Sequence, residues 1–304
     1  MNGVLVIDKP RGLTSFDVVR QVRRLCNVRR VGHAGTLDPL ATGVLPVAVG
    51  ASTRLVEYMM AGDKIYQATM KLGSFTDTQD SEGRTIEEKD WQHVDRAALD
   101  DALTAFIGEI SQLPPMYSAL KKDGKPLYQL ARQGIVVERQ PRSIRIDSLV
   151  IDDYSPPLVT FTVRCSKGTY VRTLCHDIGQ KLNCGAHMSA LRRLRCGRFD
   201  TSVSHTLEEL QSLAEQGRPL PFLSPTEVLA DWPALTLTGA ALGRLRDGVA
   251  PDMTEVDTSG LAAGNRVCFL ANGILVAIAR FVPGGYGKRP GDFEIVKVFP
   301  LAEA

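Results

Sequence analysis

A carboxylate, Asp38, stands in a stretch of glycines, small residues and apolar residues that spans positions 31–50. Pro39 follows it directly, which fixes the backbone after the acid and disfavours a helical conformation at Asp38 itself. A turn that ends before a buried strand would explain an ordinary Asp-Pro pair. Here His33, Thr36 and Thr42 crowd the same short loop. The segment therefore favours a rigidly held carboxylate that reacts with a substrate as a nucleophile or a base.

The overall charge excludes a polycation, because 36 Lys and Arg stand against 34 Asp and Glu, for a net charge of +2. A nucleic-acid surface would have to come from local clusters. Three are present, at Arg20–Arg30, Lys121–Arg145 and Arg192–Arg198. Tyr117 and Tyr128 lie in or beside the second cluster. Aromatic residues among basic ones favour RNA contact over a solvated loop for the segment 113–145.

The six cysteines never form a C-x-x-C pair, so the sequence predicts neither a disulfide framework nor a zinc site. The first residues read as a strand and a turn rather than a signal peptide. No apolar run has the length of a membrane span. We therefore expect a reduced, cytoplasmic protein without a metal ion.

Several blocks of the sequence, in the same order, resemble the bacterial tRNA pseudouridine synthases of the TruB type. The most specific is GHAGTLDPLATGVLPV, which contains Asp38. The others are VLVIDKPRGLTSFDVV at 4–19, DKIYQATMKLGSFTDTQDSEG at 63–83, LPPMYSALKKDGKPLYQLAR at 113–132, CSKGTYVRTLCHDIGQKL at 165–182 and CGAHMSALRRLRCGRF at 184–199. The chain from about residue 229 matches more loosely.

The resemblance implies isomerisation of the T-loop uridine at tRNA position 55 to pseudouridine, with Asp38 as the reacting group. The N-glycosidic bond breaks, the uracil rotates and the ribose is rejoined at C5. This chemistry needs neither a redox cofactor nor a metal, so we expect no cofactor. The sequence leaves open whether Asp38 attacks C1′, attacks C6 or removes a ribose proton.

The resemblance also assigns partners to Asp38. Arg172 matches the arginine that pairs with the catalytic carboxylate, and a fixed cation would keep a buried acid ionised. Tyr66 matches the tyrosine that stacks on the target base. Tyr170 and Leu191 match positions that hold the flipped nucleotide. Without the resemblance, Tyr66 and Leu191 would pass as core residues and Arg172 as a surface residue.

Two further positions, His33 and Asp80, follow from the same comparison. His33 matches the residue that enters the T-loop beside the extruded base. Asp80 matches a position that orients groups in the pocket. Lys9 and Lys64 are expected to be structural or to face phosphates.

Periodicity predicts the elements that must hold these residues. Strands are expected over 3–8, 64–73 and 158–165, helices from Ser15, after Asp95 and over 172–182, and a mobile acidic loop over 76–90. The helix after Asp95 should bury Leu99, Ala102, Leu103, Phe106 and Ile107. Short strands are expected over 266–270, 274–281 and 293–299.

These elements predict an α+β fold, with a mixed, largely antiparallel sheet, flanking helices and a small β-rich C-terminal domain. We expect a catalytic domain over 1–228, with the basic insertion at 113–145. Residues 229–304 are expected to form an RNA-binding domain that resembles the PUA type. The expected partner is the T-stem-loop of tRNA, bound by a monomer that needs no protein partner and no membrane.

Other interpretations remain at this point. Cys175-His176-Asp177 could belong to a metal-dependent phosphohydrolase, although the remaining histidines offer no ligand pattern. The basic clusters would also suit an RNA-binding or RNA-folding protein without catalysis. Within the resemblance, the enzyme could act on uridines in other RNAs, as guide-RNA-dependent relatives do.

Overall fold

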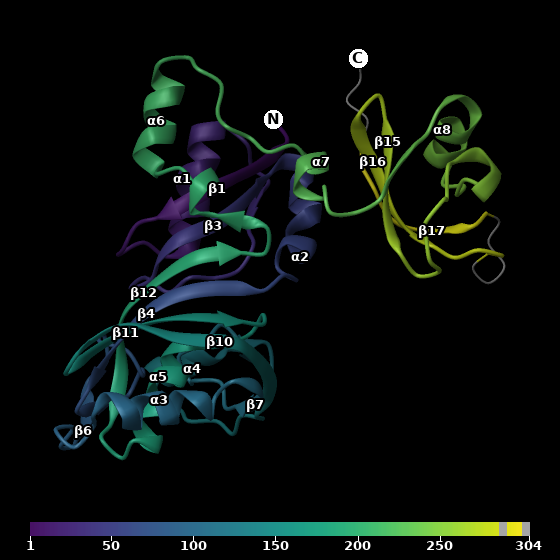
Figure 1. Cartoon of the computed structure of the whole chain (residues 1–304). Helices are drawn as coiled ribbons and strands as arrows, with labels where there is room; N and C mark the ends of the chain where they lie inside the picture. Colours follow the sequence, from purple (N-terminus) through teal and green to yellow (C-terminus); the bar gives the residue numbers. More distant parts are fainter. Residues whose placement is uncertain (286–290, 300–304) are drawn as a thin grey trace.

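The structure is a computed structural model that describes residues 1–285 and 291–299 (Figure 1). The predicted C-terminal domain, 229–304, therefore includes residues outside the described ranges. In the described part of the chain, the C-terminal sheet lies to one side of a larger unit, the body, which is formed by the residues before it (Figure 1). The basic insertion at 113–145 begins and ends within this body.

The helices of the described chain are short. They are α1 (Ser15–Cys26), α2 (Val56–Met59), α3 (Arg96–Thr104), α4 (Leu127–Arg132), α5 (Val171–Lys181), α6 (Leu207–Glu215), α7 (Pro225–Val228) and α8 (Gly239–Arg246). Turns of 3₁₀ helix cover Gly50–Leu55, Thr201–Val203 and Met253–Glu255. None of the helices within the described residues has the length and apolarity to cross a bilayer.

The strands form one large sheet, one smaller sheet and two hairpins. In the body they are β1 (Gly3–Lys9), β2 (Val31–His33), β3 (Thr42–Val49), β4 (Lys64–Leu72), β5 (Ser74–Thr76), β6 (Thr85–Glu88), β7 (Gly108–Gln112), β8 (Lys121–Lys122), β9 (Lys125–Pro126), β10 (Arg142–Ser155), β11 (Leu158–Cys165), β12 (Ala186–Cys196) and β13 (Phe199–Asp200). In the C-terminal sheet they are β14 (Ala234–Thr236), β15 (Arg266–Ala271), β16 (Ile274–Phe281) and β17 (Phe293–Val298).

The large sheet has the order β1-β3-β12-β4-β11-β10-β7, with β2 added to β3 and β13 added to β12. Its neighbours run antiparallel except β3 and β12, which are parallel. The C-terminal sheet has the order β14-β15-β16-β17. The predicted α+β fold with a mixed, largely antiparallel sheet and a β-rich C-terminal part is confirmed.

Strand β4 shows how the sequence pattern fixes the faces of the sheet. Lys64, Tyr66, Ala68, Met70 and Leu72 are buried, and the residues between them are not. Alternate side chains of a strand point to opposite faces. The predicted alternation is therefore confirmed, and the buried face packs with α1, α3, α5 and α6 in one apolar core.

Two predicted helix boundaries need correction. The N-cap of α1 is Thr14, whose hydroxyl accepts a hydrogen bond from the Asp17 N–H at 3.0 Å. Ser15, predicted as the cap, is instead buried in the helix. In α3 the cap at Asp95 is confirmed, but the helix ends at Thr104 and leaves Ile107 exposed.

Two predicted loops also carry regular structure. Residues 76–90, expected to be a mobile loop, contain most of the hairpin β5–β6. The basic insertion contains the hairpin β8–β9 and helix α4, and its last residues already belong to the long strand β10.

Candidate functional site

A cleft of about 730 Å³ opens beside the loop that joins β2 to β3. Among the residues singled out in the sequence, Asp38, Tyr66, Tyr170, Arg172 and Leu191 line it, as do Thr36 and Lys64. Ser118 and Leu120 of the insertion and Arg193 of β12 complete part of its wall. Segments far apart in the sequence thus meet around one carboxylate.

The loop that carries Asp38 is fixed on both sides of the acid. The Ser15 hydroxyl donates to the Leu37 carbonyl at 3.1 Å, and the Leu37 N–H donates back to that hydroxyl at 2.8 Å. On the other side, the Gly12 N–H donates to the Pro39 carbonyl at 2.8 Å. Leu37 is buried in the core. These anchors leave the Asp38 side chain, 37% exposed, to face the cleft.

Asp38 forms an ion pair with Arg172, whose Nη2 lies 3.1 Å from Oδ2 of the carboxylate. The same nitrogen donates to the Tyr117 carbonyl at 2.7 Å. The Nη1 atom of Arg172 lies 3.4 Å from Asp80. The Arg172 side chain is only 7% exposed, so its three partners hold it in place. The predicted pair between Asp38 and Arg172 is present in the structure.

Burial raises the pKa of Asp38 above its ordinary value. The positive charge of Arg172 opposes this effect, the charge of Asp80 adds to it, and the charge of Lys9 opposes it. The ionisation of Asp38 therefore depends on a balance between a desolvated site and its neighbouring cations.

Asp80 lies beneath Arg172 and outside the lining of the cleft. Its carboxylate accepts hydrogen bonds from the Thr78 hydroxyl at 2.7 Å and the Glu82 N–H at 3.1 Å. Its side chain is 5% exposed. Asp80 therefore orients Arg172 from a rigid turn between β5 and β6.

Arg193 is a residue that the analysis of the sequence did not single out for the site. It is 1% exposed, and it donates from Nε to the Val44 carbonyl at 2.7 Å and from Nη2 to the Gly35 carbonyl at 3.0 Å. These carbonyls lie on both flanks of the Asp38 loop. Gly43, at a φ of +98°, packs against the Arg193 backbone, where an added Cβ would lie 2.3 Å from the carbonyl oxygen. Arg193 therefore ties the loop to β12.

Tyr66 lies beside Arg193 in the same wall. Burial raises the pKa of Tyr66 to about 12, while the charge of Arg193 opposes that shift. The phenol is therefore protonated at neutral pH and can donate a hydrogen bond.

Tyr170 stands immediately before α5 and is held through its backbone. The Gln112 side chain accepts from the Tyr170 N–H at 2.8 Å and donates to its carbonyl at 3.1 Å. Gln112 is 2% exposed. The start of the helix that carries Arg172 is thus fixed by β7, and burial raises the pKa of Tyr170.

His33 ends β2 and does not belong to the described lining of the cleft. Burial lowers its pKa, and the charge of Arg193 lowers it further. Its Nδ1 atom is buried without a hydrogen-bond partner among the described residues. His33 is therefore neutral at pH 7.

Lys9 and Lys64 are structural in this structure. The Lys9 ammonium donates to the carbonyls of Pro10 and Leu13, at 2.9 and 2.6 Å, and burial lowers its pKa to about 8. The Lys64 ammonium donates to the carbonyls of Met60 and Gly62.

The basic clusters differ in their availability to a ligand. Lys121, Lys122 and Lys125 of the insertion are exposed. In the third cluster, Arg193 is buried, and Arg192 forms a two-point ion pair with Asp8 at 2.7 and 3.0 Å. Of the third cluster, Arg193 is therefore unavailable to a phosphate, and Arg192 already has a carboxylate partner.

The segment Cys175-His176-Asp177 lies inside α5. Cys175 is fully buried, and the His176 ring packs on Phe75 with centroids 4.6 Å apart. Across the described ranges, no group of three or more His, Cys, Asp or Glu residues could hold a metal ion. The metal-dependent interpretation of this segment therefore has no support in the described residues.

The sequence matches two family models and is similar to known proteins along most of its length. Residues 23–171 match the N-terminal domain of the TruB family pseudouridylate synthases, and residues 172–229 match the C-terminal domain of tRNA pseudouridylate synthase B. The tRNA pseudouridine synthase B of Syntrophotalea carbinolica is 49% identical over 300 residues, with 98% of each chain covered. That of Geobacter sulfurreducens is 47% identical over 303 residues, with 98% of this chain and 100% of the relative covered.

Solved structures agree with these matches. A Cbf5-Nop10-Gar1 complex contains a chain that is 27% identical, with a TM-score of 0.74 over 97% of this chain and 84% of that one. An H/ACA RNP bound to a substrate RNA containing 2'-deoxyuridine contains a chain that is 25% identical, with a TM-score of 0.74 over 98% and 85%.

Proposed function

The chain belongs to the TruB family of pseudouridylate synthases and is an isomerase, and from this premise we propose that it converts the T-loop uridine at tRNA position 55 to pseudouridine with Asp38 as the reacting carboxylate. The reaction breaks the bond between N1 and C1′, forms a bond between C5 and C1′, and moves the C5 proton so that N1 ends protonated. The product has the same atoms as the substrate, so no co-reactant is consumed.

The observation that carries this proposal is the ion pair between Asp38 and Arg172 inside the cleft. Attack at C1′, attack at C6 and removal of a ribose proton all begin from an ionised carboxylate. Burial disfavours that form by raising the pKa of Asp38, and the charge of Arg172 opposes this effect. Arg172 is fixed by Asp80 and Tyr117, so it cannot turn away from the acid without losing two partners.

The remaining residues of the cleft receive the extruded uridine. Flipping a base out of the loop costs a few kcal/mol, which binding in the cleft must offset. Tyr66 presents a ring for stacking, and Leu191 and Tyr170 form the apolar walls that hold the nucleotide. His33, neutral and half-buried, occupies the space that the base leaves in the T-loop.

The expected partner is the T-stem-loop of tRNA. The exposed lysines of the insertion supply phosphate contacts, which position the RNA without reading its sequence. Residues 229–304 act as the PUA-like RNA-binding domain and residues 1–228 as the catalytic domain. The protein acts as a cytoplasmic monomer, with neither a cofactor nor a protein partner.

The test is Asp38→Asn, which keeps the size of the side chain and removes its charge. We expect pseudouridine formation in unmodified tRNA to fall by at least about a hundredfold, because the reacting group is lost. Pseudouridine is mapped by carbodiimide treatment and primer extension, and tRNA binding is measured in parallel. Asp100→Asn on the exposed side of α3 is the matched control.

The same experiment separates the competing functions. Turnover of Asp38→Asn within tenfold of wild type would remove Asp38 from the chemistry. A protein that binds tRNA but leaves every uridine unmodified would be an RNA-binding protein without catalysis. If primer extension stopped at uridines of other RNAs while tRNA remained unmodified, the enzyme would have a different substrate.

A further inference from the structure

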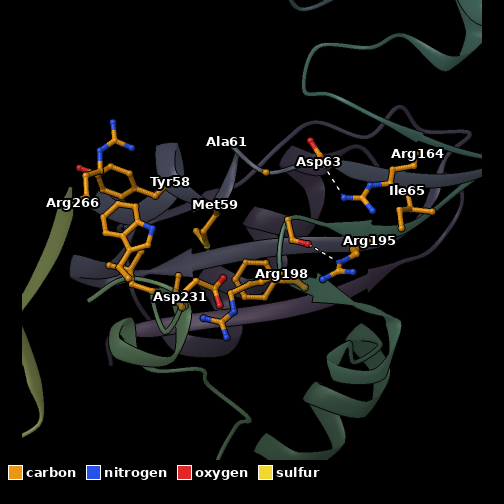
Figure 2. Close-up of a pocket in the computed structure, with 16 residues that line it drawn as sticks. Tyr58, Met59, Ala61, Asp63, Ile65, Arg164, Arg195, Arg198, Asp231 and Arg266 are labelled. Carbon is orange, nitrogen blue, oxygen red and sulfur yellow. Dashed lines mark hydrogen bonds and ion pairs between the residues drawn. The ribbon is translucent and has the colours of Figure 1, made fainter. Parts of the chain in front are cut away.

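A second cleft, of about 490 Å³, lies where the body meets the C-terminal sheet (Figure 2). We call it the junction cleft. Its floor includes Ile65 of β4, which pairs with Arg164 of β11 on one side and with Arg195 of β12 on the other. Tyr66, the next residue, points into the catalytic cleft. Successive side chains of a strand face opposite ways, so the two clefts lie on opposite faces of the large sheet.

Arginines dominate the charge of the junction cleft. Its charged residues are Arg164, Arg195, Arg198, Arg266, Asp63 and Asp231. Asp63 is already paired with Arg164 at 3.3 Å and with Arg145 at 3.6 Å. Within the described ranges, Arg195, Arg198 and Arg266 form no ion pair with a carboxylate. Four arginines and two aspartates line the cleft, which therefore carries net positive charge, although Arg195 and Arg198 lie close enough to Asp200 and Glu227 to contribute to the lowered pKa of those carboxyls.

The arginines are held in place by the backbone rather than by acids. Arg195 donates from Nε to the Gly197 carbonyl at 2.8 Å, and Arg198 donates from Nη1 to the Glu227 carbonyl. A guanidinium has five N–H donors, so each keeps others for a ligand. Figure 2 shows Arg164 and Arg195 toward one end of the cleft, Tyr58 with Arg266 at the other, and Arg198 between them near Asp231.

The end near Arg266 is aromatic. The Tyr58 and Trp232 rings meet edge to face with centroids 5.0 Å apart. The Arg266 guanidinium lies 5.5 Å from the Tyr58 ring and 5.6 Å from the Trp232 ring. Aromatic rings and guanidinium planes are the surfaces on which unpaired bases stack.

Glycines allow two loops that line the cleft to come into direct contact. An added Cβ on Gly62 would lie 2.6 Å from Cα of Gly197, so the two loops touch through their backbones. The Gly197 N–H donates to the Asp63 carbonyl at 2.9 Å, which locks that contact. A side chain at Gly62 would force the two loops apart.

We propose that the junction cleft is a second RNA-binding site, which takes a single-stranded segment with its phosphates on Arg195 and Arg198 and a base against the rings of Trp232 and Tyr58. This inference rests on the proposed function in one respect, because it presumes an enzyme that works on RNA. It assigns the arginines at the end of the third basic cluster to the face opposite the catalytic cleft.

The experiment measures binding of a fluorescein-labelled, 5′-phosphorylated tetra-adenylate to the full chain by anisotropy. Tetra-adenylate contains no uridine, and saturating T-stem-loop RNA is added to fill the catalytic cleft. The variant is Arg195→Gln with Arg198→Gln, and the matched control is Arg96→Gln with Arg218→Gln, which removes the same charge elsewhere. Circular dichroism and thermal unfolding check that both fold.

We expect the Arg195 and Arg198 variant to bind tetra-adenylate at least about fivefold more weakly than wild type, with the control unchanged. When log affinity is plotted against log salt concentration, the slope for this variant should be less steep than that of wild type by about 1.4, because each of the two lost phosphate contacts removes about 0.7. In a Trp91→Phe background, the oligonucleotide should quench the fluorescence of Trp232.

Three results would overturn the proposal. The first is equal affinity of the two double variants for tetra-adenylate, and the second is loss of tetra-adenylate binding once T-stem-loop RNA is present. The third is that an oligoglutamate peptide of matched charge binds as tightly as tetra-adenylate. The last result would assign the cleft to an acidic protein. If T-stem-loop RNA itself fails to bind, the proposed function fails, while the dependence of tetra-adenylate on Arg195 and Arg198 still decides this proposal.

Discussion

Arg172 decides how much of Asp38 is ionised at neutral pH. Burial raises the pKa of Asp38 and the Arg172 charge lowers it, so the two effects work against each other on one group. Asp80 attracts the same guanidinium while its own charge raises the pKa of Asp38. The acid therefore works in the pH range that this arginine makes accessible.

Removing the charge of Arg172 should shift the pH dependence of turnover. In Arg172→Met the pKa of Asp38 should rise further, so the carboxylate becomes protonated at a higher pH. The acid limb of the pH–rate profile should therefore shift to higher pH. Arg172→Lys keeps the charge but not the planar fork, so its shift should be smaller. Single-turnover rates from about pH 5 to about pH 9 measure both variants. Profiles that coincide with wild type would show that Arg172 does not control Asp38.

Arg193 is a buried cation whose partners are carbonyl oxygens rather than carboxylates. It holds the Asp38 loop through the carbonyls of Val44 and Gly35, and its charge adds to the effect of burial, which lowers the pKa of His33. These two effects, one geometric and one electrostatic, can be separated by substitution.

Arg193→Met should raise the pKa of His33, because a neighbouring positive charge is removed. It should also lower turnover by about a hundredfold, because a reacting group displaced by about 1 Å loses roughly that much. In Arg193→Lys the pKa of His33 should stay low while turnover remains reduced. NMR titration of the imidazole gives the pKa, and Arg192→Gln, which breaks an ion pair on the same strand, is the control. A His33 pKa that is unchanged in Arg193→Met would contradict the electrostatic role.

The residues of the site that sequence could predict are those with a distinctive local pattern or a family motif. Asp38 stands out by its glycine-rich loop, and the family motifs add Arg172 and Asp80. Arg193 could not be separated from its basic neighbours, because sequence does not show which arginine of LRRLR faces the core. Alternation along β12 would not have found it either, because the register of the strand shifts between Arg193 and Arg195, so these two arginines differ in burial although they are two residues apart.

At the scale of elements, the side-chain amide of Gln112 connects strand β7 to the start of helix α5 by hydrogen bonds. Gln112 satisfies both backbone groups of Tyr170, so the helix that carries Arg172 begins at a fixed place. The strand itself was not predicted, because its five residues, GEISQ, carry a weak pattern.

Gln112→Leu should lower the free energy of unfolding by about 1–3 kcal/mol, because it leaves the Tyr170 N–H without a partner, whereas the Tyr170 carbonyl still accepts from the Leu174 N–H at 3.0 Å. Gln67→Leu, on the exposed side of β4, should change it by less than about 0.5 kcal/mol. Urea unfolding followed by circular dichroism measures both. A loss in Gln112→Leu no larger than in Gln67→Leu would mean that water or a shifted chain replaces the amide.

Helices and strands with clear periodicity were predicted with small errors, as β4, β11 and α5 show. The errors fall where tertiary contacts override local preference. Residues 76–90 looked mobile because they are polar, yet Asp80 is buried there by its contact with Arg172. The parallel pairing of β3 with β12 also depends on residues far apart in sequence.

At the scale of the molecule, the body and the C-terminal sheet share a core. Val4, Val6 and Met59 of the body pack in one cluster with Leu275 and Ile278 of β16. A chain cut at residue 228 would expose this cluster, so point substitutions test the C-terminal part better than truncation does.

Ile278→Ala should destabilise the whole chain by about 2–5 kcal/mol, because it opens a cavity in the shared core. Ile274→Ala, on the same strand but 52% exposed, is the matched control. Trp91 in the body and Trp232 at the junction can be followed separately in single-tryptophan variants. We expect both to report one unfolding midpoint. A Trp232 transition that precedes the Trp91 transition would show that the two parts unfold independently.

The loop that carries Asp38 leaves the ribosome long before the residues that complete the site. Arg172 and Arg193 are made much later, and until they arrive the acid has neither its counter-charge nor its anchor to β12. In an unfinished chain, Asp38, the carboxylate that we propose reacts, should therefore lack both the burial that raises its pKa and the contacts that fix its loop. The capacity to modify RNA arises late in translation, when β12 closes the sheet between β3 and β4.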